Sequence, residues 1–163
     1  MDFDLRTAGV DDVDLVLDLM QGLYASEHIL FDPERARRAL LELLADSSLG
    51  RVYLIQADGK AIGYAVLTLG YSLEFAGRYA LLDELFIRED FRGRGAGRQI
   101  LAHLEPDCRT LGLQALRLEV ERKNRGAREL YTRLGFETHD RDLMTLWLPE
   151  APGGAHENET FSG

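Results

Sequence analysis

Apolar residues recur along the chain with the spacings of alternating strands and helices. Near the N-terminus, Phe3 and Leu5 alternate with acids, which predicts a short first strand. A helical period then begins after the candidate N-caps Asp11 and Asp12. Its apolar positions are Val13, Val16, Leu17, Met20 and Tyr24. This spacing predicts an amphipathic helix that packs on a sheet.

A second helix and a β-hairpin are predicted next. Asp32 is a candidate N-cap, and Pro33 stands at the first helical position, where proline is tolerated. The apolar stripe of this helix would be Ala36, Ala39, Leu40, Leu43 and Leu44. Strands over 52–56 and 61–69 would pair across the turn Asp58-Gly59. An Asp-Gly pair between apolar segments is a strong short-range hairpin signal.

The stretch from Leu81 to Arg98 predicts a strand, a glycine-rich turn and the start of a helix. Residues 81–88 form a short apolar segment with the acids Asp83 and Glu84 inside it. Regular alternation would place Asp83 on the face of Leu85 and Ile87, and Glu84 on the opposite face. The turn that follows lacks a Cβ at positions 93, 95 and 97, so its backbone can approach a ligand closely.

The remaining elements alternate in the same way. The helix after the turn should end near Gly112, and Pro106 is expected to kink or split it. Its apolar positions are Ile100, Leu101, Leu104, Cys108 and Leu111. Residues 116–120 alternate as a strand, and Asn124 and Gly135 would cap and stop one more helix.

Two last strands, over 136–138 and 143–148, are expected to complete the sheet. The tail 151–163 is polar and rich in glycine, which predicts disorder. A chain of 163 residues with 45% hydrophobic content can bury a single core. We therefore expect one domain over residues 1–150.

Composition excludes several classes of function. The chain has no run of 18 apolar residues and an acidic N-terminal segment unlike a signal peptide, so we expect a cytoplasmic protein without membrane contact. The net charge of -9 argues against nucleic-acid binding. One cysteine, Cys108, can form neither an internal disulfide nor a cysteine metal cluster, and we predict no metal site.

The glycine-rich turn fits one of three known phosphate-binding patterns. A Rossmann fingerprint requires a third glycine where Arg98 stands. A Walker A loop requires glycine followed by lysine and a hydroxyl residue, and no glycine of this turn is followed by that pair. The pattern [QR]-x-x-G-x-[GA] is matched by Arg92, Gly95 and Gly97. In this the chain resembles the GCN5-related N-acetyltransferase (GNAT) family, which binds acetyl-CoA through that pattern.

A second hallmark of the same family follows at the family's usual separation. The match is Asn124-x-x-Ala127-x-x-x-Tyr131-x-x-x-Gly135-Phe136. The resemblance covers about residues 3–148. It implies an α/β (α+β) domain with a central mixed, mostly antiparallel sheet of six to seven strands, flanked by about four helices.

The resemblance also implies a set of acetyl-CoA-binding residues. Backbone groups of Leu85, Phe86 and Ile87 would run beside the pantetheine arm, and an N–H near Ile87 would bind the reaction's oxyanion. The pyrophosphate would lie at the turn and the helix N-terminus. The turn residues are Arg92, Gly93, Arg94, Gly95, Ala96, Gly97 and Arg98, and Asn124, Ala127 and Tyr131 complete the set. The alternative is that the glycines only make a tight turn.

Catalytic roles follow from direct attack of an amine on the thioester. Tyr131 matches the family residue that protonates the leaving thiolate, although its ring also lies on an apolar stripe and could simply pack. Asp83 or Glu84, whichever faces the cleft, would bind a cationic acceptor or take its proton. The alternative for both is an ordinary solvated or salt-bridged acid. A covalent acyl-enzyme is disfavoured, because Cys108 lies away from the motifs.

These observations predict an acetyl-CoA-dependent N-acetyltransferase. Similarity to the small-amine branch favours a polyamine, diamine, lysine-like or aminoglycoside acceptor. A protein N-terminus or lysine is the nearest alternative, and a non-catalytic acetyl-CoA-binding sensor is an alternative of another class. The family often dimerises, so a homodimer remains open.

Overall fold

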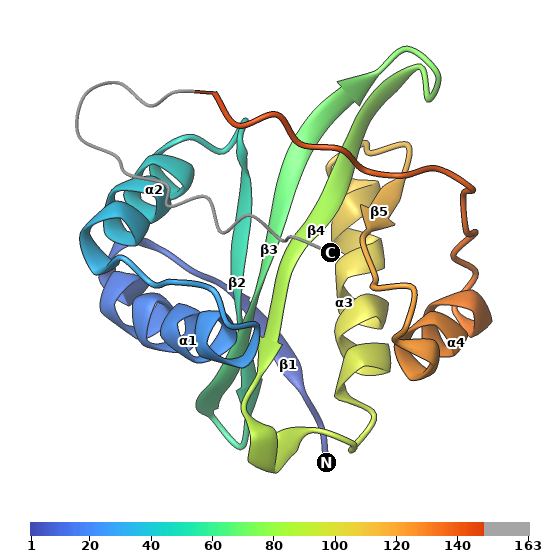
Figure 1. Ribbon diagram of the computed structural model, residues 1–163. Coiled ribbons are helices and arrows are strands. Elements are labelled where there is room, and N and C mark those ends of the chain that lie inside the picture. The colour runs from blue at the N-terminus through green and yellow to red at the C-terminus, as the bar shows by residue number, and fades with distance from the viewer. Residues whose placement is uncertain (149–163) are drawn as a thin grey trace, which may run out of the picture.

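Five strands lie side by side in chain order, from β1 at one edge of the sheet to β5 at the other (Figure 1). The computed structural model describes residues 1–148. The pairs from β1 to β4 are antiparallel, whereas β4 and β5 are parallel. The strands are β1 (Asp4–Thr7), β2 (Gly50–Ala57), β3 (Lys60–Ser72), β4 (Gly77–Ile87) and β5 (Leu116–Leu118). The predicted α/β class with a mixed, mostly antiparallel sheet is confirmed.

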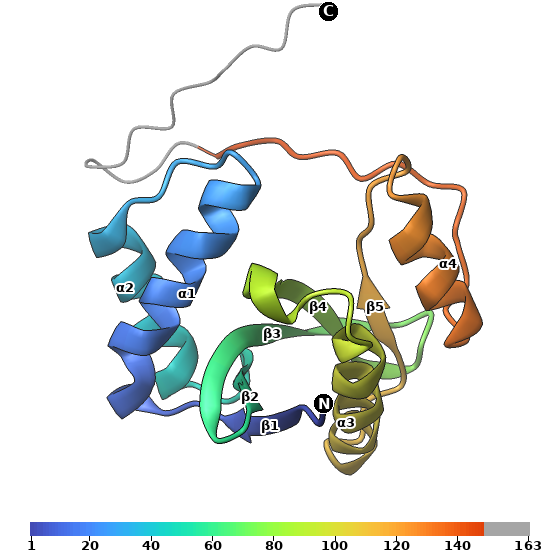
Figure 2. The same ribbon diagram turned by 90° about the horizontal axis from the view of Figure 1, so that it is seen from below.

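Helices cover both faces of this sheet. They are α1 (Val13–Ser26), α2 (Pro33–Ala45), α3 (Ala96–Thr110) and α4 (Arg125–Arg133), with short 3-10 helices η1 (Val10–Asp12) and η2 (Glu89–Phe91). The groups α1–α2 and α3 contribute to separate apolar clusters. α1 and α2 lie at one side of the molecule and α4 at the other, with β4 and β5 between them (Figure 2).

The alternation of β2 shows how the two clusters divide the sheet. Val52 and Leu54 are buried in the cluster of α1 and α2, while Tyr53 and Ile55 are buried in the cluster of α3. Because successive strand residues point to opposite faces, a strand buried on both sides is apolar at nearly every position. The sheet is therefore the middle layer of three.

The predicted cap of α2 and the predicted hairpin turn are confirmed. The Asp32 side chain accepts hydrogen bonds from the backbone N–H groups of Glu34 and Arg35, each at 3.1 Å. Between β2 and β3, Asp58 and Gly59 have φ values of 50° and 75°. Two central residues with positive φ are what a type I′ turn requires.

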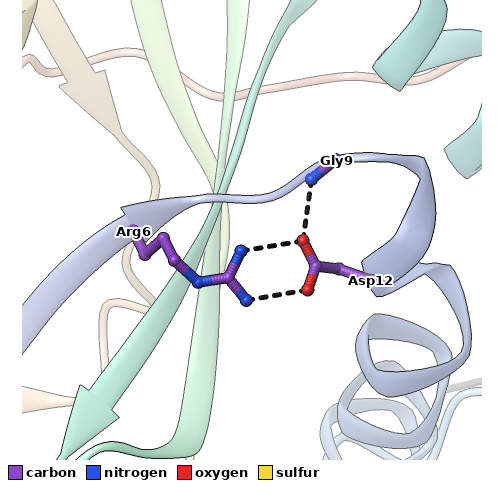
Figure 3. Close-up of polar contacts among 3 residues, drawn as sticks. All are labelled: Arg6, Gly9 and Asp12. Carbon is purple, nitrogen blue, oxygen red and sulfur yellow. Dashed lines mark hydrogen bonds and ion pairs between the residues drawn. The ribbon is translucent and has the colours of Figure 1, made fainter.

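An ion pair fastens β1 to the start of α1 (Figure 3). The two terminal nitrogens of Arg6 donate to the carboxylate of Asp12 at 3.0 and 2.7 Å, and the Gly9 N–H donates to it at 2.9 Å. The hydrogen bond from Arg6, followed by that from Gly9, lowers the pKa of Asp12. The carboxylate thus stays charged where the chain turns from strand to helix.

Pro106 was predicted to kink or split its helix, and a split is contradicted because α3 runs from Ala96 to Thr110 with Pro106 inside it. An exposed proline removes one backbone hydrogen bond, while Ile100 and Leu104 are fully buried and hold the helix on the sheet. The helix ends at Thr110, near Gly112 as predicted, and Gly112 has a φ of 71°.

The two last predicted strands were also wrong, so the described sheet has five strands rather than six or seven. Residues 136–138 and 143–148 belong to no strand, and the side chains of Leu143 and Met144 are 75% and 90% exposed. The apolar residues of these two segments suggested that they would be buried. A strand must also pair with the edge of a neighbouring strand. β5 ends at Leu118 instead of 120 and offers only three residues.

Among residues 1–148, no helix is long and apolar enough to cross a membrane. The predicted disordered tail, 151–163, lies outside the described residues.

Candidate active site

A β-bulge in β4 sets the direction of the acid pair. Val66 pairs with Glu84 and Leu67 with Leu82, so Asp83 is the extra residue of the bulged strand. Leu82 and Leu85 therefore both pack with the cluster of α3, three positions apart. The predicted placement of Glu84 on the face opposite Leu85 and Ile87 is confirmed, because Glu84 bonds to Tyr64 of the cluster of α1 and α2. Regular alternation does not extend through Asp83, and the sequence-based assignment of its face did not include this bulge.

Glu84 lies on the face of α1 and is held by two phenols. The hydroxyl of Tyr24, from α1, donates to Oε1 at 2.9 Å. The hydroxyl of Tyr64, from β3, donates to Oε2 at 2.7 Å. Each carboxylate oxygen thus receives one hydrogen bond, and three elements of the fold meet at this group.

Burial dominates the electrostatics of the acid pair. It raises the pKa of Glu84, while the hydrogen bonds from Tyr64 and Tyr24 act in the opposite direction. The neighbouring charges of Asp83 and Glu27 raise it further. Burial also raises the pKa of Asp83, whose side chain still reaches solvent. The pKa of each carboxyl group is therefore raised from its ordinary value, which suits a group that accepts a proton.

β4 and β5 part next to the acid pair. Their parallel pairing covers Ala80 to Leu82 on β4 and Leu116 to Leu118 on β5, with no further pair among the described residues. Beyond Leu82, the edge of β4 that faces β5 is open. The side chains of Leu85 and Ile87 pack toward α3, and Phe86 packs toward α1, so the open edge has apolar walls on both sides.

The glycine-rich turn leads from this edge into α3. Gly93 and Gly95 have φ values of 71° and 78°, in the left-handed region that side chains disfavour. Gly95 is the N-cap of α3, so the first N–H groups of the helix lack partners within it. Arg92 supports the turn, because its Nε donates to the carbonyl of Ile87 at 2.7 Å. Arg94 stacks on the ring of Phe91 at 5.8 Å.

Ala96 and Gly97, the next two residues of the turn, lie in the first turn of α3 and face its neighbours. Ala96 is buried with 4% exposure. A Cβ on Gly97 would lie 3.4 Å from Cδ2 of Leu130, which is an ordinary van der Waals contact, so α3 faces α4 at this position. Arg98 is exposed beside them.

The second motif caps α4 at both ends. Oδ1 of Asn124 accepts a hydrogen bond from the N–H of Ala127 at 3.1 Å. At the other end Gly135 has a φ of 93°, and the N–H of Phe136 donates to the carbonyl of Tyr131 at 2.9 Å. Together with the bond from Gly135 to Thr132 at 3.0 Å, this is a Schellman motif. The predicted cap and stop are confirmed.

Tyr131 and Glu84 lie on opposite faces of the sheet. Tyr131 is partly buried against the cluster of α3, and burial raises its pKa. Glu84 is bonded to Tyr64 of the other cluster. The structure thus brings Glu84 to the phenols of Tyr24 and Tyr64, while Tyr131 packs with the cluster of α3 on the other face of the sheet.

Comparison with known proteins identifies the family of this chain. Residues 17–136 match the profile of the acetyltransferase (GNAT) family. The chain belongs to the GNAT family. Members use acetyl-CoA as cosubstrate, so the protein is an acetyl-CoA-dependent acyltransferase, as its two motifs predicted.

Individual GNAT relatives cover most of the chain. An uncharacterised N-acetyltransferase of Methanocaldococcus jannaschii is 26% identical over 148 residues, which is 90% of this chain and 65% of that protein. The chain therefore spans just under two thirds of that relative's length. The aminoalkylphosphonate N-acetyltransferase of Salmonella typhimurium is 28% identical over 144 residues, 88% of this chain and 91% of the relative.

A solved structure extends the likeness to the fold. An integron cassette protein from the mobile metagenome of Cole Harbour Salt Marsh matches with a TM-score of 0.79 and 34% identity. The match covers 90% of this chain and 91% of that one. The GNAT domain is thus matched over nearly its whole described length.

Two residues of the candidate site were not predicted from the sequence. Tyr24 was assigned to the buried stripe of a helix, and Tyr64 to the middle of an apolar strand. A signal existed, because a buried tyrosine nearly always finds a partner for its hydroxyl. Tyr64 is 0% exposed, and its partner lies 20 residues away in Glu84.

Proposed function

We propose that this GNAT protein transfers the acetyl group of acetyl-CoA directly to a primary amine on a small cationic molecule. Polyamines, diamines, lysine-like compounds and aminoglycosides are the acceptor classes. The observation that carries the proposal is the position of Asp83 and Glu84, an acid pair beside the point where β4 leaves β5.

The open edge of β4 and the turn before α3 suit the cosubstrate. Backbone groups of Leu85, Phe86 and Ile87 can pair with an extended pantetheine arm as a further strand would. Free N–H groups at the turn and the helix N-terminus favour an anion such as pyrophosphate. Positive φ at Gly93 and Gly95 supports this fit, because the chain there takes a conformation that exposes backbone rather than side chain.

The two faces of the sheet would serve the two proton transfers. An acyl group held between β4 and β5 has Glu84 of the acid pair on the side of α1 and Tyr131 on the side of α3. The acceptor's ammonium group gives its proton to the acid pair, directly or through water, and the free amine attacks the carbonyl carbon. The N–H of Ile87 would stabilise the oxyanion. The attacking nitrogen loses its second proton to solvent as the carbon–sulfur bond breaks and the amide forms. The phenol of Tyr131 protonates the thiolate and is itself reprotonated from solvent.

The surroundings of the acid pair favour a cation over a neutral acceptor. Two carboxyl groups lie next to each other in a protein of net charge -9. Aromatic rings line the same region, with Tyr24 edge-on to Phe31 at 5.5 Å and Tyr64 beside Phe86 at 6.3 Å. Carboxylates and aromatic faces are both partners for ammonium groups. The Salmonella relative, named for an aminoalkylphosphonate, supports a small amine-bearing acceptor.

The proposal is tested by release of CoA thiol from acetyl-CoA, followed with a thiol-reactive dye. The acceptors are spermidine, lysine, an aminoglycoside and a pool of peptides with free N-termini. Selective turnover of a small cationic amine is the expected result. Turnover of the peptides alone would assign a protein acetyltransferase instead. Tight acetyl-CoA binding without turnover of any acceptor would contradict the proposed reaction and favour a binding module.

A further inference from the structure

We propose that Tyr24 and Tyr64 are positioning residues of the transfer reaction, which hold the Glu84 carboxylate in one orientation so that it can receive the acceptor's ammonium group. This inference rests on the proposed function. It assigns roles to two side chains that the family motifs do not include, one from α1 and one from β3.

The geometry restricts rotation of the carboxylate. Oε1 accepts from Tyr24 at 2.9 Å and Oε2 accepts from Tyr64 at 2.7 Å, so any turn about the last side-chain bond of Glu84 lengthens at least one of these hydrogen bonds. A carboxylate offers about four lone-pair sites, and two phenols occupy only half of them. Each oxygen can thus still accept an N–H of a bound ammonium group.

The direction of both hydrogen bonds is fixed by the surroundings. Burial, and then the charge of Glu84, raise the pKa of Tyr64 and of Tyr24 far above the ordinary value for a phenol. Both hydroxyls therefore stay protonated at neutral pH and act as donors to the carboxylate. Charge-assisted bonds of this kind are the stronger class of hydrogen bond.

The phenol rings are themselves held in place. Tyr64 is fully buried and lies beside Phe86, while Tyr24 meets Phe31 edge-on at an angle of 87°. Phe31 lies between α1 and α2, so the connection between these helices is coupled to the orientation of Glu84. A carboxylate buried only for stability would gain little here, because an apolar residue of the same volume packs as well or better.

The test is steady-state kinetics of Tyr24→Phe and Tyr64→Phe with an acceptor that the wild-type protein acetylates. Each substitution removes one hydroxyl and keeps the ring. We expect the acceptor KM to rise about tenfold in each variant, which corresponds to one charge-assisted hydrogen bond, while kcat and the KM for acetyl-CoA change less than about threefold. Tyr79→Phe is the matched control, because Tyr79 lies on β4 and its ring packs on Phe75.

The pH profile gives a readout that a purely structural role would not move. The charged and titratable groups around Glu84 are Tyr24 and Glu27 from the end of α1, Tyr64 from β3, and Asp83 from β4. Loss of a phenol donor disfavours the charged form of Glu84, so the acidic limb of kcat/KM should move to higher pH in both variants and stay in place in the control.

Two outcomes separate this inference from the proposed function. An active wild type whose two phenylalanine variants keep the acceptor KM and the acidic limb would overturn the positioning role alone. A wild type that acetylates no amine would overturn the proposed function itself. For a variant with a lowered melting temperature, the kinetics are repeated well below that temperature, and an unchanged acceptor KM there also counts against the inference.

Discussion

The rings of Tyr131 and Phe136 pack at a centroid distance of 5.7 Å and an angle of 62°. They occupy the two positions whose side chains commonly meet across a Schellman motif, because Gly135 between them turns the chain with a φ of 93°. Much of the second family motif is therefore a set of helix caps. A catalytic role for Tyr131 has to be separated from this packing by experiment.

Gly135→Ala should destabilise the protein by about 1 kcal/mol, because alanine in the left-handed region brings its Cβ close to the next carbonyl oxygen. The change is measured as a shift of the urea midpoint. Gly126→Ala is the matched control on the same helix, where a new Cβ meets nothing within 4 Å. It should leave stability unchanged or raise it slightly. Equal losses in the two variants would contradict the assigned cap.

Tyr131→Phe should lower kcat about 100-fold and leave the melting temperature nearly unchanged. The reason is that the variant loses the proton donor but keeps the ring that packs on Phe136. Steady-state kinetics and a thermal melt measure both effects. A variant with full kcat would show that Tyr131 is only a packing residue, and the proposed acid would have to be another group.

Gly95→Ala should weaken CoA binding, measured by titration calorimetry, and should also lower stability by about 1 kcal/mol. The φ of 78° is strained for alanine, and relaxation of this strain would turn the N–H groups of the turn away from the pyrophosphate. Gly9→Ala serves as control, since that glycine also has open space but no positive φ. An unchanged CoA affinity in Gly95→Ala would remove the turn from the cosubstrate site.

Asp12→Asn should lower stability at neutral pH by a few degrees of melting temperature, and should have little effect in strong acid. The pKa of Asp12 is lowered in the folded protein, so its contribution is present above the ordinary value of 3.8 and is lost as the pH falls through the lowered folded value. Melts of both proteins across this range measure the effect. The exposed neighbour Asp11 provides the control variant Asp11→Asn, which should match wild type.

Features set by neighbouring residues could be predicted from the sequence. The Asp32 cap, the Asp58-Gly59 turn and the glycine at position 135 each depend on a few adjacent residues and on the conformations open to them. The helices followed from apolar spacing for the same reason. The family motifs allowed acetyl-CoA to be predicted as the cosubstrate. Their glycines at positions 95 and 135 take positive φ values in the structure.

Features set by distant partners could not be predicted. The hydrogen bond from Tyr24 to Glu84 spans 60 residues, and the bulge at Asp83 depends on the register between β3 and β4. Neither leaves a local signal. The prediction of a strand over 143–148 was wrong for a related reason. The composition of this segment shows that it is apolar, but it does not show which strand of the sheet the segment would pair with.

The central claim is that Asp83 and Glu84 select a cationic acceptor. The direct measurement compares kcat/KM for spermidine with kcat/KM for an uncharged-side-chain peptide with a free N-terminus, in the wild type and in the double variant Asp83→Asn, Glu84→Gln. We predict a strong preference of the wild type for spermidine, and a loss of about 100-fold or more in the double variant with CoA affinity unchanged. A wild type that prefers the peptide, or a double variant with unaltered preference, would contradict the account.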